Sequence, residues 1–198
     1  MTARLAVLIS GRGSNLQAFI DACASGSLAA EISVVISNNP DAPGLARAAA
    51  AGIATRCINH RDYEDRPSFD LALARELGHW QLDLVILAGF MRILTPTFIK
   101  PFYGRLLNVH PSLLPKYPGL NTHQRVIDAN EQLHGATVHF VTEELDGGPI
   151  IAQQSLEIHT DDSAESLARR VLEIEHRLYP FALQLCINGN ARYVNGEC

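Results

Sequence analysis

Short hydrophobic runs separate stretches of mixed polarity along the first half of the chain. Val, Ile and Leu dominate residues 4–10, 31–37 and 82–88, and each run is followed by Gly or Asn. Strands that are buried on both faces of a parallel sheet have this composition. The pattern therefore predicts three parallel strands, and the run RLLNVH at residues 105–110 predicts a fourth.

The stretches between these runs have the spacing of amphipathic helices. Hydrophobic residues recur with a helical period in residues 15–25, 44–52 and 66–78. A chain that alternates strand and helix in this way joins its strands by right-handed crossovers and forms an open, twisted sheet. The first half of the chain is thus predicted to have an α/β fold.

The pattern changes in the second half. Residues 136–141 and 148–158 form two further strand-like runs, and the segment between them is too short for a helical crossover. We therefore expect these two strands to be antiparallel and to extend a mostly parallel sheet.

A long helix is expected near the C-terminus. Asp161, Asp162 and Ser163 are candidate N-terminal caps. The hydrophobic positions that follow on one helix face are Leu167, Val171, Ile174 and Leu178. Pro180 is expected to end or kink this helix, and the segment INGN at 187–190 is a stop signal.

Composition indicates the class of protein. The 198 residues are 47% hydrophobic and 19% charged, as in an ordinary globular protein, and we find no linker, low-complexity segment or internal repeat. We expect a single domain over residues 1–198, with one half at 1–104 and the other at 105–198. The formal net charge of −5 disfavours a nucleic-acid-binding protein, which normally carries a basic surface.

The cysteines and the N-terminus favour the cytoplasm. The four cysteines, at positions 23, 57, 186 and 198, include no CxxC pair, so neither a zinc site nor a disulfide framework is indicated. The apolar run before Gly11 is too short for a signal peptide, and no stretch approaches the length of a membrane-spanning helix. We expect a cytoplasmic protein that binds neither nucleic acid nor membranes.

A glycine-rich turn joins the first predicted strand to the first helix. Gly11 and Gly13 lie in the turn, and Ser14 and Asn15 are expected at the helix cap. Such a turn offers free backbone N–H groups and the positive end of the helix dipole to a phosphate. The third glycine of the dinucleotide fingerprint and the Walker lysine are both missing, which disfavours NAD, FAD and nucleoside triphosphates. A sugar phosphate fits better, and a tight turn with a polar cap is the alternative; Arg12 is either a second anchor for the anion or a surface residue.

Asn108 and His110 stand at the carboxyl end of the fourth predicted strand, the edge at which open α/β sheets bind ligands. Alternation along the strand puts both side chains on one face, where they can converge on one ligand atom. Pro111 and Pro115 fix backbone φ angles in the following loop and so preorganise the site. A histidine held by purely structural contacts is the alternative interpretation.

A carboxylate partner for His110 is available in the segment ELDGGP at 144–149. If Asp146 meets His110, it favours the imidazolium form, which is a good proton donor and oxyanion partner. An Asx turn is the alternative role of Asp146. The eight histidines show no close ligand spacing such as HExxH, and His134 and His139 flank a strand, so we expect no metal site. Surface or packing roles are assigned to His60, His79, His123, His159 and His176.

Six segments carry a resemblance to a known family. They are ISGRGSN, LAGFMRIL, LLNVHPSLLPKYPG, HGATVHFV, ELDGGPI and EHRLYP. In order and spacing the chain resembles the 10-formyltetrahydrofolate-dependent formyltransferases over almost its whole length. The Asn-x-His-Pro-Ser and Asp-Gly-Gly segments resemble all enzymes of that family, whereas GRGSN and PKYPGLNTH resemble the branch that formylates glycinamide ribonucleotide. Arg12 departs from that branch, in which Asn or Thr is common at this place.

The resemblance implies a Rossmann-like formyltransferase fold and a reaction. The amine of glycinamide ribonucleotide is implied to attack the formyl carbon of the cosubstrate 10-formyltetrahydrofolate directly, in purine biosynthesis. Asn108, His110 and Asp146 are the implied catalytic set. Asn108 and His110 stabilise the oxyanion, and Asp146 keeps His110 protonated.

The resemblance also implies binding residues. Those for the ribonucleotide are Gly11, Arg12, Gly13, Ser14, Asn15 and Glu175. Those for the folate are Arg66, Met91, Arg92, Ile93, Leu94, Asn108, Val141, Thr142, Glu143, Glu144, Leu145 and Asp146. Apart from the resemblance, the local sequence places Glu175 at the edge of a hydrophobic stripe, where its carboxylate either meets a cation or reaches water. The apolar side chains also suit a core, and Arg66 also suits a solvated helix.

Three other functions remain open. A hydrolase that releases formate from the same folate uses the same Asn, His and Asp, and a noncatalytic binder of folate or sugar phosphate needs none of their chemistry. Formylation of methionyl-tRNA is disfavoured by the acidic charge. We expect a monomer or a homodimer that acts on small molecules.

Overall fold

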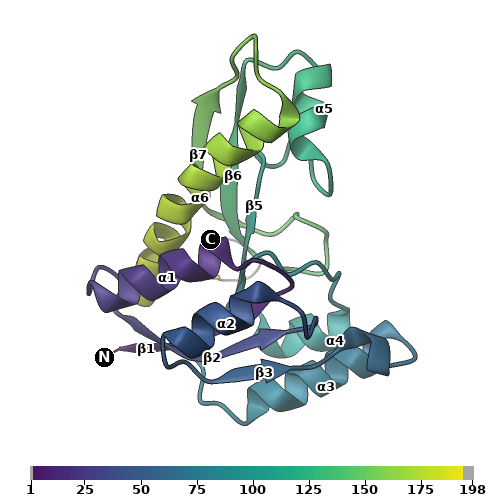
Figure 1. Cartoon of the computed structure of the whole chain (residues 1–198), viewed down its shortest axis with the longest axis vertical. Coiled ribbons are helices and arrows are strands. Elements are labelled where there is room, and N and C mark those ends of the chain that lie inside the picture. Colours follow the sequence, from purple (N-terminus) through teal and green to yellow (C-terminus); the bar gives the residue numbers. More distant parts are fainter. Residues whose placement is uncertain (1, 194–198) are drawn as a thin grey trace. The chain divides into compact units, whose positions relative to one another are not determined.

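The computed structural model describes residues 2–193 (Figure 1), and these divide into two compact units, unit 1 up to Leu107 and unit 2 from Asn108 onward. The strands follow the order β3-β2-β1-β4-β5-β6-β7 in a seven-stranded sheet, and β5 (Leu106–His110) spans the boundary between the units. The predicted α/β class, with a mostly parallel sheet, antiparallel strands in the C-terminal half and a long C-terminal helix, is confirmed.

Unit 1 is built on four parallel strands. They are β1 (Ala3–Ile9), β2 (Ala30–Ser37), β3 (Thr55–Cys57) and β4 (Leu84–Leu87). The helices are α1 (Ser14–Ala24), α2 (Pro43–Ala50), α3 (Arg66–Gly78) and α4 (Pro96–Ile99), with 3-10 turns η1 (His60–Asp62) and η2 (Lys100–Phe102). Every residue of β4 is buried, as its continuous hydrophobic run predicts.

The strand order of unit 1 determines where a ligand can bind. From β1 the chain moves outward to β2 and β3, and it then returns to place β4 on the other side of β1. Right-handed crossovers put α1 and α2 on one face of the sheet and α3 on the opposite face, and Figure 1 shows α1 and α2 lying apart from α3. The point where the order reverses lies between the carboxyl ends of β1 and β4, which is where open α/β sheets bind ligands.

Unit 2 combines an antiparallel strand pair with two helices. β6 (Leu133–Phe140) pairs antiparallel with β7 (Ile150–Glu157), which confirms the expected hairpin. The helix α6 (Ala164–Ile187) packs against both strands, and α5 (Thr122–Asp128) packs against α6. Nearly all of β6 is buried, whereas β7 is mostly exposed, as suits the last strand of the sheet.

The C-terminal helix α6 begins as expected but does not end at Pro180. Ser163 is the N-cap, and its side chain and that of Ser166 form a reciprocal capping box. The expectation that Pro180 ends α6 is wrong, because the helix continues to Ile187, the first residue of the INGN segment. Proline removes a single backbone hydrogen bond, whereas α6 packs against β6 and β7 and its residues Tyr179 and Leu183 are fully buried.

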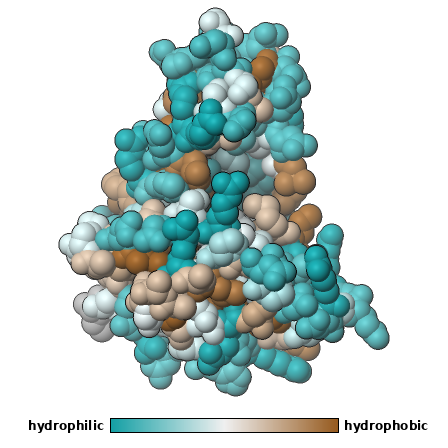
Figure 2. Space-filling model, in the orientation of Figure 1, coloured by the Kyte–Doolittle hydropathy of each residue, from teal (hydrophilic) through white to brown (hydrophobic). Residues whose placement is uncertain are grey.

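The visible surface of unit 2 around α5 and the start of α6 is mainly hydrophilic, with scattered hydrophobic residues (Figure 2). Among the described residues, no helix has the length and hydrophobicity needed to cross a membrane. The free cysteines Cys23, Cys57 and Cys186 form no disulfide, and Cys198 lies outside the described residues.

Candidate active site

The end of β5 presents two polar side chains from the same side of the strand. Leu106 and Leu107 are fully buried and anchor the strand, whereas Asn108 is partly exposed and His110 is 6% exposed. The intervening Val109 packs into the core. The hydrophobic part of β5 therefore holds its polar carboxyl end in a fixed position.

Both ring nitrogens of His110 face hydrogen-bond acceptors. Nδ1 lies 3.3 Å from Oδ2 of Asp146, and Nε2 lies 2.9 Å from the backbone carbonyl oxygen of Tyr117. A carboxylate and a carbonyl can only accept, so a ring with a proton on each nitrogen satisfies both contacts. The structure thus brings Asp146 to His110, with the geometry of an imidazolium between two acceptors.

Asp146 is held by its own turn and by a neighbouring loop. Its φ angle is 54°, in the left-handed region that non-glycine residues rarely adopt. Oδ2 also accepts a hydrogen bond of 2.9 Å from the backbone N–H of Gly119. The backbone of the turn and this bond to Gly119 together aim the carboxylate at His110, beyond what an Asx turn alone requires.

The sequence did not identify His139 as a site residue, but in the structure it lies between Asn108 and Asp146. Its Nε2 is 3.3 Å from Nδ2 of Asn108 and 3.8 Å from Oδ1 of Asp146, and its Nδ1 is 2.9 Å from the carbonyl oxygen of Phe140. His139 was interpreted only as a residue at a strand end. The alternation of Thr137 and His139 along β6 is a signal that both face the same side, but it does not show which side the site occupies.

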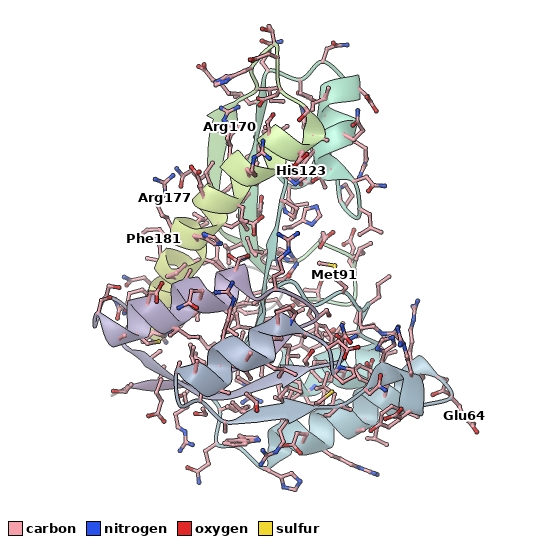
Figure 3. All side chains as sticks on the ribbon, viewed as in Figure 1. Glu64, Met91, His123, Arg170, Arg177 and Phe181 are labelled. Carbon is pink, nitrogen blue, oxygen red and sulfur yellow. The ribbon has the colours of Figure 1, made fainter. Side chains whose placement is uncertain are left out.

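Two further histidines lie close to His110 in unit 2. His123 of α5, which is labelled in Figure 3, and His134 of β6 have Nδ1 and Nε2 3.0 Å apart. Burial, and then the charges of His123 and His110, lowers the pKa of His134 to about 4. Burial, and then His110, also lowers the pKa of His123. This pair is therefore mostly neutral near neutral pH.

The loop after His110 is fastened to the unit 2 strands. Thr137 Oγ1 donates to the carbonyl oxygen of Ser112 at 2.6 Å and accepts from the N–H of Leu114 at 3.1 Å. Gln153 Nε2 donates to the carbonyl oxygen of Leu114 at 2.9 Å. Buried hydrogen bonds of this kind fix the path of residues 111–115 and with it the backbone that follows His110.

The glycine-rich turn of unit 1 differs from the prediction in the residue that caps α1. Gly13, with a φ angle of 71°, is the N-cap of α1, whereas Ser14 is the first helical residue and Asn15 is buried within the first turn. The expectation that Ser14 and Asn15 cap the helix is therefore wrong, because the turn needs a left-handed residue at the cap and only glycine adopts it freely. Arg12 is exposed, and its carbonyl oxygen accepts from Nε of Arg47 at 2.9 Å.

A second glycine, which the sequence analysis did not single out, lies against this turn. Gly44 donates its N–H to the carbonyl oxygen of Gly11 at 3.0 Å. A Cβ at Gly44 would lie 2.5 Å from Cδ1 of Ile9 and 3.1 Å from the carbonyl oxygen of Gly11. The absence of a side chain at position 44 therefore lets α2 approach the turn closely.

The predicted folate residues of unit 1 lie after β4 and at the start of α3. Met91 donates its N–H to Ser10 Oγ at 2.8 Å, which brings this segment to the glycine-rich turn (Met91 is labelled in Figure 3). Met91 and Ile93 are exposed, whereas Leu94 is buried. The Arg92 guanidinium lies 5.8 Å from the ring centre of Phe69, and Arg66 is exposed at the first position of α3.

The predicted folate residues of unit 2 precede Asp146 in the turn between β6 and β7. Val141 and Thr142 are partly exposed, and Glu143, Glu144 and Leu145 are exposed. Thr142 Oγ1 donates to the carbonyl oxygen of Glu144 at 3.5 Å. The candidate folate residues thus divide between the two units.

Glu175 is buried within α6. The exposed fraction of the whole residue is 8%. A carboxylate at this depth is costly unless a donor or a cation meets it. Within residues 2–193, no group of three or more His, Cys, Asp and Glu side chains has an arrangement that could hold a metal ion.

Comparison with known proteins gives consistent matches. The chain matches the family described as formyl transferase over residues 3–183. It is 45% identical over 199 residues to phosphoribosylglycinamide formyltransferase of Escherichia coli strain K12, an alignment that covers 98% of this chain and 94% of that protein.

Other relatives are a larger protein and a solved structure. Over 96% of its length, the chain is 48% identical to the trifunctional purine biosynthetic protein adenosine-3 of Bos taurus, of which it spans 19%. The solved structure of glycinamide ribonucleotide transformylase 1 from Symbiobacterium toebii matches with a TM-score of 0.96 and 42% identity, over 99% of this chain and 92% of that chain.

Proposed function

The chain belongs to the formyl transferase family and is a transferase enzyme, and we propose that it transfers the formyl group of 10-formyltetrahydrofolate to the amine of glycinamide ribonucleotide. The observation that carries this proposal is His110, whose two ring nitrogens face Asp146 and Tyr117 beside the amide of Asn108. The names of the relatives that match over almost the whole chain support the choice of acceptor.

The reaction is a direct attack of an amine on a formyl carbon. A new C–N bond forms to the glycinamide nitrogen, the formyl oxygen takes up negative charge, and the bond from carbon to N10 of the folate then breaks. After attack by the neutral amine, the glycinamide nitrogen loses one proton and N10 gains one. An α-amino group has a pKa of roughly 8, so a substantial fraction is already neutral and no strong base is required.

The main requirement is stabilisation of the oxyanion. Asn108 Nδ2–H and the Nε2–H of His110 are the two donors that this proposal assigns to it. Removal of one such donor typically raises the barrier by about 3 kcal/mol. The Asp146 carboxylate at Nδ1 keeps the ring of His110 protonated and oriented, so that a proton is available when N10 leaves.

The backbone carbonyl of Tyr117 accepts the hydrogen bond from the Nε2–H group of His110, and this mechanism needs the same N–H group for the oxyanion. A formyl oxygen that approaches Nε2 replaces this carbonyl as the acceptor, so residues 116–118 must shift when the folate binds. Tyr117 has a φ angle of 57°, a conformation that costs energy for a residue with a Cβ. That strain lowers the cost of giving up the contact.

The remaining predicted residues are assigned to substrate binding. The backbone of residues 11–15 takes the ribose phosphate at the start of α1, with Arg12 as an additional cation. Buried Glu175 takes the glycinamide amine, a cation before it loses its proton. Exposed Met91 and Ile93 contribute an apolar wall for the pterin, and Arg66 pairs with the glutamate tail of the folate.

The experiment that tests the proposal measures release of tetrahydrofolate from 10-formyltetrahydrofolate, with and without glycinamide ribonucleotide. We expect release only with the acceptor, and a loss of release in His110→Ala. Release without the acceptor indicates a hydrolase instead. No release in either case contradicts the assignment of His110.

A further inference from the structure

We propose that His139 is a positioning residue that holds the side-chain amide of Asn108 with its N–H groups directed for donation. The inference rests on the proposed function, in which Asn108 donates to the oxyanion. His139 lies 2% exposed beside Asn108 and Asp146, and all of these groups belong to unit 2. No step of the transfer needs His139 to touch the substrate.

The proton of His139 is located by its neighbour in the chain. Nδ1 lies 2.9 Å from the carbonyl oxygen of Phe140, and because a carbonyl can only accept, Nδ1 carries a proton. Nε2 then has a proton only if the whole ring is charged. Burial is the largest influence on the pKa of His139 and lowers it, against the opposing effects of the Phe140 carbonyl and Asp146, while His110 lowers it further.

A neutral ring with its proton on Nδ1 leaves a lone pair on Nε2. The group 3.3 Å from that lone pair is Nδ2 of Asn108, which must therefore donate. This bond uses one of the two N–H groups of the amide and leaves the other for a ligand. If the amide were reversed, its oxygen would face the lone pair, so His139 selects the orientation in which Asn108 is a donor.

The local backbone also supports this arrangement. Val138 of β6 lies opposite Ala152 and His139 lies opposite Ile150, so the extra residue of this β-bulge is Ile151 of β7. A bulge bends the strand that contains the extra residue, here β7, and bulges are common next to active sites. β6 itself keeps its regular alternation, which places His139 on the same face of the strand as Thr137.

Protonation of His139 would reverse this selection. The charged groups that face the ring are the carboxylate of Asp146, whose Oδ1 is 3.8 Å from Nε2, and His110. An Nε2–H group would no longer accept from Asn108, and it would compete with His110 for Asp146. The neutral state of His139 is thus the one in which Asn108 and His110 both act as donors.

The test compares two substitutions at position 139. In His139→Leu the acceptor is lost and the volume is largely kept, and we expect kcat to fall by about 10- to 100-fold with KM for both substrates changed little. In His139→Gln the side-chain oxygen can accept from Asn108, so we expect it to recover most of that loss. His79→Leu, at an exposed histidine that follows α3, is the matched control.

A double-mutant cycle separates positioning from a general structural role. If His139 acts through Asn108, then adding His139→Leu to Asn108→Ala lowers kcat no further. Independent losses that multiply in the double variant would overturn the proposal. Thermal unfolding of each variant verifies that it is folded, and a variant that does not fold is replaced by His139→Met in the same cycle.

A spectroscopic measurement tests the proposal without activity. The ¹⁵N signals of the His139 ring near neutral pH are expected to show a protonated Nδ1 and an unprotonated Nε2. A protonated Nε2 would overturn the inference even if the enzyme transfers formyl groups. Conversely, failure of acceptor-dependent release in the wild-type protein would overturn the proposed function and leave this signature unaffected.

Discussion

At the scale of single residues, proton positions decide what the site can do. His110 has an acceptor at each ring nitrogen, whereas burial lowers the pKa values of His123, His134 and His139. The sequence could predict that Asn108 and His110 share a face, because strand alternation is local. It could not predict the proton positions, because they depend on partners such as the carbonyls of Tyr117 and Phe140 that only the folded chain brings near.

Replacing Asp146 with Asn tests the charge at His110. The amide cannot favour the imidazolium as a carboxylate does, so we expect kcat to fall by roughly 100-fold or more, with smaller changes in KM. Steady-state kinetics measure kcat at saturating concentrations of both substrates. Asp21→Asn, at an exposed carboxylate of α1, is the control. Unchanged kcat in Asp146→Asn would contradict the role of this contact.

The buried histidine His134 predicts how stability depends on pH. Its pKa is lowered to about 4 in the folded state, whereas in the unfolded chain it is about 6.5. Because the unfolded chain binds the proton more readily, the contribution of His134 to the free energy of unfolding is complete above about pH 6.5. It is lost as the pH is lowered toward about 4.

Urea unfolding at about pH 7.5 and about pH 5 measures this dependence. We expect the wild-type protein to lose more stability between these pH values than His134→Gln, which cannot titrate at this position. An equal loss in both proteins would show that His134 does not contribute.

At the scale of elements, hydrophobic periodicity predicted the strands and long helices, and local chemistry determined where they end. The short strand β3 escaped prediction because Thr55–Cys57 has no hydrophobic run. The helix α6 continues past Pro180 because packing against β6 and β7 outweighs one lost hydrogen bond. In each case tertiary contacts overrode the local signal.

Gly44 provides a test of the turn that is proposed to hold phosphate. The Cβ of Gly44→Ala would clash with Ile9 and crowd Gly11, so we expect a loss of about 1–3 kcal/mol in the free energy of unfolding. We also expect a higher KM for the ribonucleotide. In Gly78→Ala the new Cβ meets nothing within 4 Å, and this helical control should gain about 0.5–1 kcal/mol. Equal effects at the two positions would contradict this account.

The capping box of α6 predicts a separable effect on stability. Ser163→Ala removes the side-chain acceptor for the N–H of Ser166, and we expect the free energy of unfolding to fall by about 1 kcal/mol. Ser163→Asp keeps an acceptor and should retain most of the wild-type value. Urea unfolding measures both variants, and equal losses in Ala and Asp would rule out the cap as the cause.

At the scale of the whole molecule, the proposed chemistry and the proposed phosphate site fall in different compact units. Unit 2 contains Asn108, His110 and Asp146, and unit 1 contains the turn at residues 11–15. The parallel sheet of unit 1 follows from the alternation of strands and helices, and the hairpin of unit 2 follows from its short connection. The residues assigned to the folate divide between the two units, a division that only the family resemblance indicated.

The fate of the formyl carbon tests the central claim most directly. The protein is supplied with 10-formyltetrahydrofolate labelled with ¹³C at the formyl group, together with glycinamide ribonucleotide, and the labelled product is identified by NMR. We predict that the label appears on the amine nitrogen of the ribonucleotide, in amounts equal to the tetrahydrofolate released. Label found in free formate, or retained on the folate, would contradict the proposed transfer.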